Sequence, residues 1–153
     1  MIIDQLKENR ANEYTALLHK LIQNYESFPL EGRKKFIQDW NLQAVKKKIN
    51  SHLLLFCDIN DRMNGLLLGT YPEGGVSTIL WLLVEEEFRA KGMGKLLIDS
   101  SIQFYKRKNS HKIKLSICEK YLLKFYEKLG FRLEGRHSRH WWETTFYSLG
   151  KEL

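Results

Sequence analysis

The stretch VEEEFRAKGMGKLLIDSSIQFY, residues 84–105, joins an apolar run to an amphipathic segment through a basic loop with two glycines. The preceding run, VSTILWLLV at 76–84, is typical of a long, largely buried strand. The apolar spacing after the loop predicts a helix over about 94–108. The sequence therefore predicts a strand, a glycine-containing loop and a helix in direct succession.

The loop has the chemistry of an anion-binding site. A helix N-terminus carries unpaired N–H groups and a partial positive charge, and glycines let a bulky anion approach the backbone closely. Arg89, Lys91 and Lys95 add positive side chains around Gly92 and Gly94. The pattern favours a phosphate or a pyrophosphate, although the glycines could instead serve only a tight turn. The spacings of a Walker loop and of a dinucleotide fingerprint are both absent.

The flanking sequence predicts four helices and seven strands. The helices lie within 11–28, 33–49, 94–108 and 120–131. The strands are expected at 2–6, 52–59, 66–71, 76–84, 112–118, 132–136 and 140–153. Asn9 or Asn12 is expected to cap the first helix, and Pro29 and Gly32 are expected to break the helical pattern.

The order of these elements predicts a mixed α/β sheet. The helix between 76–84 and 112–118 implies a parallel crossover, whereas the neighbouring hairpins imply antiparallel pairs. A sheet of about six or seven strands with helices on both faces follows. A chain of 153 residues without repeats or a linker is expected to form one domain over 1–153.

The charge distribution and the cysteines limit the possible partners and the cellular location. Residues 1–75 contain 10 Lys and Arg against 9 Asp and Glu, whereas residues 76–153 contain 15 against 9. The basic second half fits an anionic partner, either a phosphorylated cofactor or a nucleic acid, or a solvated surface. No apolar run is long enough to span a membrane. Cys57 and Cys118 are expected to be buried thiols of a cytoplasmic protein, and no metal site is expected.

Two motifs resemble those of the GNAT superfamily of N-acetyltransferases. Its acyl-CoA loop has Arg or Gln, two residues, Gly, one residue and then Gly or Ala, which Arg89, Gly92 and Gly94 match. Val84 fits the Val that ends the preceding strand. The second motif, KFYEKLGF at 124–131, resembles a later helix of the family. The expected order of elements is similar to the family's over nearly the whole chain.

The resemblance implies transfer of an acetyl group from acetyl-CoA to a primary amine of a small molecule or peptide in a ternary complex. It places the pyrophosphate of the cofactor on Arg89, Ala90, Lys91, Gly92, Met93, Gly94 and Lys95. It implies that the pantetheine arm pairs with Leu82, Leu83 and Val84, where the neighbouring parallel strands part.

The same resemblance gives Tyr126 the role of protonating the leaving thiolate, although a purely packed aromatic ring would fit the same pattern. Glu119 stands where many members carry an Asn that bonds the cofactor. A carboxylate can accept from a pantetheine N–H but cannot donate, so this contact differs here.

The general base stays open among Glu119, His137, His140, Glu143 and a water chain. Lys114 stands where acetyltransferases of ribosomal-protein type carry a Glu, which argues against that subgroup. The three carboxylates at 85–87 are expected to be solvated or to act on the helix dipole.

The acceptor is expected between the early helical region, YESFPLEGRKKF at 25–36, and the last hairpin. In that hairpin the candidate substrate-binding residues are Arg136, His137, Arg139, His140 and Trp141. They would suit an anionic or aromatic acceptor, or they form ordinary solvated surface.

Two other functions stay open. The basic half permits a toxin-like acetyltransferase acting on aminoacyl-tRNA, although CoA is itself anionic and accounts for part of this charge. Because Glu119 replaces the Asn of many members, the protein could instead be a catalytically silent acyl-CoA sensor. The sequence leaves the acceptor and the oligomeric state open, a homodimer included.

Overall fold

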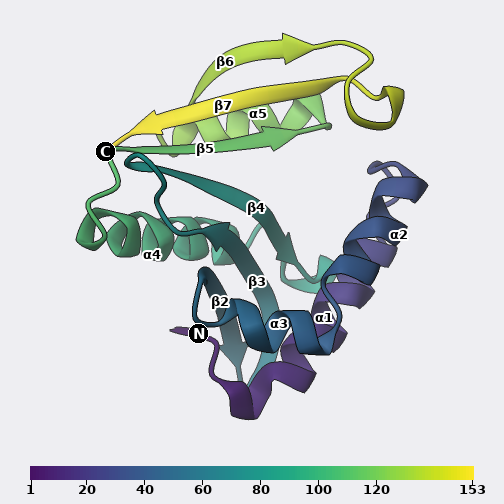
Figure 1. Cartoon of the computed structure of the whole chain (residues 1–153), viewed down its shortest axis with the longest axis vertical. Coiled ribbons are helices and arrows are strands. Elements are labelled where there is room, and N and C mark those ends of the chain that lie inside the picture. The colour runs from purple at the N-terminus through teal and green to yellow at the C-terminus, as the bar shows by residue number, and fades with distance from the viewer.

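The computed structural model describes residues 1–153 and contains one seven-stranded mixed sheet in the order β1-β2-β3-β4-β5-β7-β6 (Figure 1). The strands are β1 Ile2–Gln5, β2 His52–Ile59, β3 Arg62–Thr70, β4 Val76–Val84, β5 Lys112–Ile117, β6 Arg132–His137 and β7 Phe146–Glu152. The helices are α1 Ala11–Gln23, α2 Leu30–Asp39, α3 Leu42–Lys48, α4 Met93–Arg107 and α5 Leu123–Lys128. Short 3-10 turns are η1 Glu8–Arg10, η2 Glu86–Phe88, η3 Lys120–Leu122 and η4 Trp141–Glu143. The predicted mixed α/β architecture is confirmed.

Two buried clusters cover the two faces of the sheet. One lies under α1–α3 and includes Trp81 and Leu83 of β4, and the other lies under α4 and α5 and includes Ile79 of the same strand. Both faces of β4 are therefore covered, because successive side chains of a strand point to opposite faces. Figure 1 shows α4 and α1–α3 on opposite sides of the central strands.

The helical region near the N-terminus differs from the prediction. The single helix expected over 33–49 is two helices, because Trp40 leaves the helical conformation with φ −109° and ψ 46°. Asn41 then caps α3 by accepting from the Ala44 N–H at 3.0 Å. The break between α1 and α2 covers residues 24–29, so Pro29 lies in it as predicted, whereas Gly32 lies inside α2.

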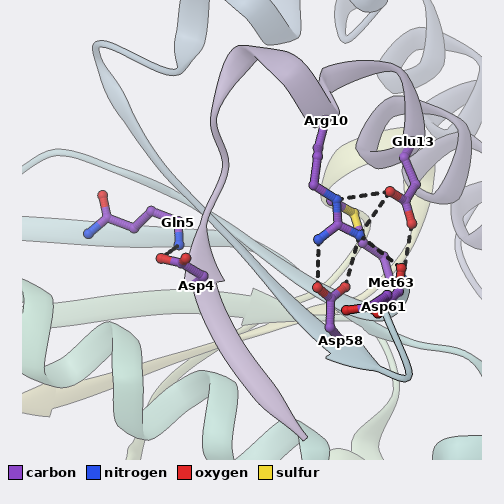
Figure 2. Close-up of polar contacts among 7 residues, drawn as sticks. All are labelled: Asp4, Gln5, Arg10, Glu13, Asp58, Asp61 and Met63. Atoms are coloured by element: carbon purple, nitrogen blue, oxygen red, sulfur yellow. Dashed lines mark hydrogen bonds and ion pairs between the residues drawn. The ribbon is translucent and has the colours of Figure 1, made fainter.

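The start of α1 is held by Arg10 rather than by an asparagine cap. The Arg10 guanidinium donates to both oxygens of Asp58, at 2.5 and 3.1 Å, and to Glu13 at 2.9 Å (Figure 2). The other oxygen of Glu13 accepts from the Met63 N–H at 3.1 Å. This network ties α1 to the β2–β3 hairpin, whose two-residue turn at Asn60 and Asp61 has positive φ and lets β3 begin four residues earlier than predicted.

The parallel strands β4 and β5 pair only at one end. The register runs from Val76 opposite Lys112 to Thr78 opposite Lys114, and no further pairs follow although both strands continue. Opposite β3, a bulge leaves Leu80 as the extra residue of β4. Figure 1 shows the two strands diverging toward α2. A wedge therefore opens in the middle of the sheet.

The last strand begins at Phe146 rather than at residue 140. The preceding residues form η4 and its flanking turn, where Arg139, Trp142 and Glu143 all have positive φ. Trp141 and Trp142 therefore lie at the tip of the β6–β7 hairpin instead of alternating across a strand.

Cys57 is buried as predicted, whereas Cys118 is only partly buried because it follows the end of β5; both are free thiols. No helix combines the length and the apolar character that crossing a membrane requires.

Candidate active site

A cavity of about 760 Å³ fills the wedge between β4 and β5. It reaches both faces of the sheet, from the N-terminus of α4 on one side to α2 and the β6–β7 hairpin on the other. Thr78, the last β4 residue in register with β5, is among its lining residues. Beyond Thr78 the edge of β4 that faces β5 has no partner strand, so an extended ligand can pair with it.

Gly92 forms an open cradle at one end of this cavity. It is the residue before α4 and has φ 85°, a conformation that glycine adopts without strain. A Cβ on Gly92 would meet no atom within 4 Å. The helix has no side-chain cap and no acidic residue in its first turn, so its N–H groups stay available to an anion. These features fit the pyrophosphate of CoA.

Gly94 has a different role from Gly92. A Cβ at Gly94 would lie 3.3 Å from Cζ of Phe125 and 3.8 Å from Cδ2 of Leu82. The absence of a side chain lets α4 pack closely against α5 and β4. Gly94 also lines the cavity, so close packing and access to the cavity both apply to it.

The other residues of the predicted loop divide into two groups. Arg89, Ala90 and Lys95 line the cavity, and Nε of Arg89 donates to the Val84 carbonyl at 3.1 Å. Lys91 instead lies over the Phe88 ring at 5.6 Å and does not line the cavity. The Met93 side chain is buried in the core under α4, so only its backbone faces the predicted anion site.

Tyr126 lies on α5 and lines the cavity. Its ring packs against Phe125 and Phe131, at centroid distances of 4.9 and 5.6 Å. Burial raises the pKa of Tyr126 well above its usual value, and no hydrogen bond contributes to the shift. The phenol is therefore protonated at neutral pH, as an ordinary tyrosine is, and burial makes it a weaker acid.

Glu119 follows β5 and is the one acidic residue that lines the cavity. It is 9% exposed, and its Oε2 atom is fully enclosed without a hydrogen-bond partner. Hydrogen bonding to this carboxylate is the main cause that raises the pKa of Tyr121, and it adds to the larger effect of burial on the pKa of Tyr25. The neighbours of Glu119 in the chain are therefore two tyrosine hydroxyls and no cation. Of the four candidate base side chains, only Glu119 lines the cavity.

The far side of the cavity has an aromatic wall. The Trp81 ring lies 4.9 Å from Phe28, 5.0 Å from Phe36 and 6.0 Å from Tyr25, between ring centroids. Three of these residues come from the 25–36 segment that the sequence analysis named as an acceptor wall. The strand pattern gave no sign of Trp81, since an apolar strand residue is ordinarily core.

The predicted basic residues of the last hairpin lie outside this cavity, although Trp141 lines it. Arg139 is 81% exposed and pairs with Glu143 at 2.6 Å. His137 bonds Ser148 at 3.0 Å, and His140 lies against the Trp141 ring at a centroid distance of 4.3 Å. Arg136 is exposed on β6. The hairpin therefore contributes aromatic rings rather than charge to the site.

The expectation that Glu85 is solvated is wrong, because Glu85 is buried. Its carboxylate accepts from Arg62 at 3.0 Å, Lys20 at 3.2 Å and Asn64 at 3.3 Å. Burial alone would raise its pKa, but these hydrogen bonds outweigh it and hold the pKa below the ordinary 4.5. Glu85 thus fixes the end of β4 just before the glycine loop.

The loop cradle, the parted strands and the buried tyrosine meet at one cavity, and the family comparison gives the class of protein. Residues 17–142 match the family model described as acetyltransferase (GNAT) domain. The chain belongs to this family and is a GNAT-type N-acetyltransferase.

Relatives support the same assignment. Glucosamine 6-phosphate N-acetyltransferase of Trypanosoma brucei brucei is 28% identical over 144 residues, which cover 88% of this chain and 90% of the relative. The PaiA N-acetyltransferase of Thermoplasma acidophilum, solved in complex with coenzyme A, superposes with a TM-score of 0.83 at 15% identity, over 99% and 98% of the two chains. A GNAT-family acetyltransferase of Streptococcus pneumoniae gives 0.83 at 17% identity over the same shares. The GNAT fold expected from the motifs is confirmed.

Proposed function

We propose that this chain transfers the acetyl group of acetyl-CoA to a primary amine by direct attack within a ternary complex. The observation that carries the proposal is the single cavity that brings together the Gly92 cradle, the unpaired edge of β4, Glu119 and Tyr126. Acetyl-CoA supplies the acetyl group as a thioester. The chain's own residues bind the two substrates, orient them and move the protons.

The α4 side of the cavity holds the donor. The N–H groups at the start of α4, with Arg89 and Lys95, bind the pyrophosphate. The backbone of Leu82, Leu83 and Val84 pairs with the pantetheine arm as a strand would, because β5 has left this edge of β4. The same backbone N–H groups stabilise the negative charge that develops on the thioester oxygen.

The protons move at two side chains. The amine nitrogen bonds to the carbonyl carbon of the thioester, and the carbon–sulfur bond breaks. Glu119 accepts the proton that the amine loses, because it is the one acidic residue that lines the cavity. Tyr126 donates a proton to the leaving thiolate, and solvent restores both side chains afterwards.

Gly92→Val tests the donor site. The new side chain would occupy the open cradle, so we expect the affinity for CoA to fall at least about tenfold, which is ~1.4 kcal/mol. Isothermal titration calorimetry with CoA measures this directly. Undiminished affinity would mean that the pyrophosphate binds elsewhere.

Gly74→Val is the matched control for backbone strain. Gly74 has φ 59°, and a Cβ there would also meet no atom within 4 Å, but it does not line the cavity. Both variants therefore carry a similar conformational penalty. We expect similar losses of thermal stability and a loss of CoA affinity only in the Gly92 variant.

A further inference from the structure

Six aromatic rings from five segments surround the acceptor end of the cavity, which we call the aromatic box. They belong to Tyr25, Phe28, Phe36, Trp81, Trp142 and Phe146. Phe28 lies 5.7 Å from Trp142 and 5.9 Å from Phe146, between centroids, so the hairpin and the α1–α2 segment close on each other. Such a wall favours a ligand that buries apolar groups against it.

Gly32 lets this box close. A Cβ on Gly32 would lie 2.6 Å from Cε1 of Phe28 and 2.8 Å from Cζ3 of Trp142. Trp142 itself is held at φ 51°, a left-handed conformation that costs a bulky residue energy. The hairpin tip is therefore fitted closely against α2, so the roof of the box has a defined position.

Glu119 is the only charged side chain that the cavity offers away from the α4 loop. Its neighbours in the chain are the hydroxyls of Tyr25 and Tyr121, and no ion pair of the chain includes it. A largely buried carboxylate without a cation is costly, and a ligand ammonium group in the cavity would relieve that cost through a charge-assisted hydrogen bond.

The box has no cation for a phosphate. The two basic residues that line the cavity, Arg89 and Lys95, belong to the α4 loop, and the basic residues of the hairpin face elsewhere. A phosphate group in the box would meet Glu119 without a counter-ion. These observations count against the phosphorylated amino sugar named for the trypanosomal relative, and against a nucleic acid.

We propose that the acceptor is a hydrophobic primary amine without phosphate, whose apolar body fills the aromatic box and whose ammonium group is held by Glu119. This inference rests on the proposed function and narrows it to an acceptor class.

The test is binding to the CoA-loaded protein, measured by calorimetry with 2-phenylethylamine, 2-phenylethanol and glucosamine 6-phosphate. We expect the amine to bind at least about tenfold more tightly than either of the others, because only the amine satisfies both the box and Glu119. Tighter binding of glucosamine 6-phosphate would overturn the acceptor class while leaving acetyl transfer to amines in place. Failure of the protein to bind CoA would overturn both proposals.

Two variants separate the contributions. Glu119→Gln should weaken 2-phenylethylamine about tenfold and leave 2-phenylethanol unchanged, since only the amine carries charge. Trp142→Ala should weaken both ligands, because both place their ring in the box. Equal loss of amine and alcohol in Glu119→Gln would show a packing role and contradict the assignment of the ammonium site.

Discussion

A buried carboxylate follows each of the two parting strands, β4 and β5. The side chains around the two carboxylates differ. Glu85 follows β4 and accepts hydrogen bonds from two cations and an amide, whereas Glu119 follows β5 and has only tyrosine hydroxyls as neighbours. A buried carboxylate that is paired with cations stabilises the fold, but one without a cation costs stability and is kept where a ligand can supply the positive charge. The β4 side is therefore the rigid support of the site, and the β5 side carries its reactive groups.

Tyr126→Phe probes the β5 side with the largest expected effect. The variant keeps the ring packing and removes only the transferable proton, so kcat should fall by about 10²–10⁴-fold while CoA affinity is nearly unchanged. Single-turnover measurement of acetyl transfer avoids masking by slow product release. Tyr105→Phe is the control, because Tyr105 is also buried with an unpartnered hydroxyl but lies outside the cavity. A wild-type rate in Tyr126→Phe would leave water as the proton source.

Glu85→Gln probes the β4 side. We expect the free energy of unfolding to fall by about 2 kcal/mol at pH 7, less than the ~3–5 kcal/mol of a fully buried pair because Arg62 and Lys20 are more than half exposed. Chemical denaturation measures the loss. In a chain of this size a 2 kcal/mol loss corresponds to a fall in Tm of about 4–8 °C.

The same variant has a defined pH dependence. The folded-state pKa of Glu85 is lowered, so its stabilisation is fully present above the ordinary value of 4.5 and is lost as the pH falls through the folded value. The stability difference between the wild type and Glu85→Gln should therefore be constant near neutrality and shrink below pH 4.5. A difference that stays constant down to acid unfolding would show that charge at Glu85 contributes nothing.

Glu119→Gln should behave in the opposite way in the absence of ligands. An amide costs less to bury than a carboxylate without a cationic partner, so the free energy of unfolding should stay the same or rise by about 1 kcal/mol. The same denaturation experiment as for Glu85→Gln gives the comparison. A loss as large as that of Glu85→Gln would mean that Glu119 has a structural partner and would remove the contrast between the two strands.

The sequence predicted the strand bounds better than the surroundings of the side chains. The bounds of 76–84 and 52–59 match β4 and β2 because apolar runs bounded by turn residues leave little freedom. The break at Trp40 and the left-handed conformation of Trp142 were not predicted, since tryptophan ordinarily adopts neither conformation.

Long-range pairing was hidden from the sequence as well. Glu85 was expected in solvent because its partners Arg62 and Lys20 are 23 and 65 residues away. Trp81 was assigned to a strand, but nothing local indicates that its neighbourhood opens into a cavity. The motifs located Tyr126 and Glu119, but only the fold shows that Glu119 lies beside Tyr25 and Tyr121.

Arg136→Ala and Arg139→Ala are expected to have the smallest effect. The sequence gives both residues an acceptor-binding role, yet neither lines the cavity, and Arg139 pairs with the equally exposed Glu143. Exposed ion pairs contribute only ~0–1 kcal/mol, so KM for an amine acceptor should change by less than about fivefold, and the stability should change little. Steady-state kinetics with 2-phenylethylamine at saturating acetyl-CoA gives the KM values, with Trp142→Ala as the positive control from the same hairpin. A larger rise in KM for either arginine variant than for Trp142→Ala would mean that the hairpin binds the acceptor through charge. The basic residues of the hairpin would then bind the acceptor, and the aromatic rings of the box would only support the fold.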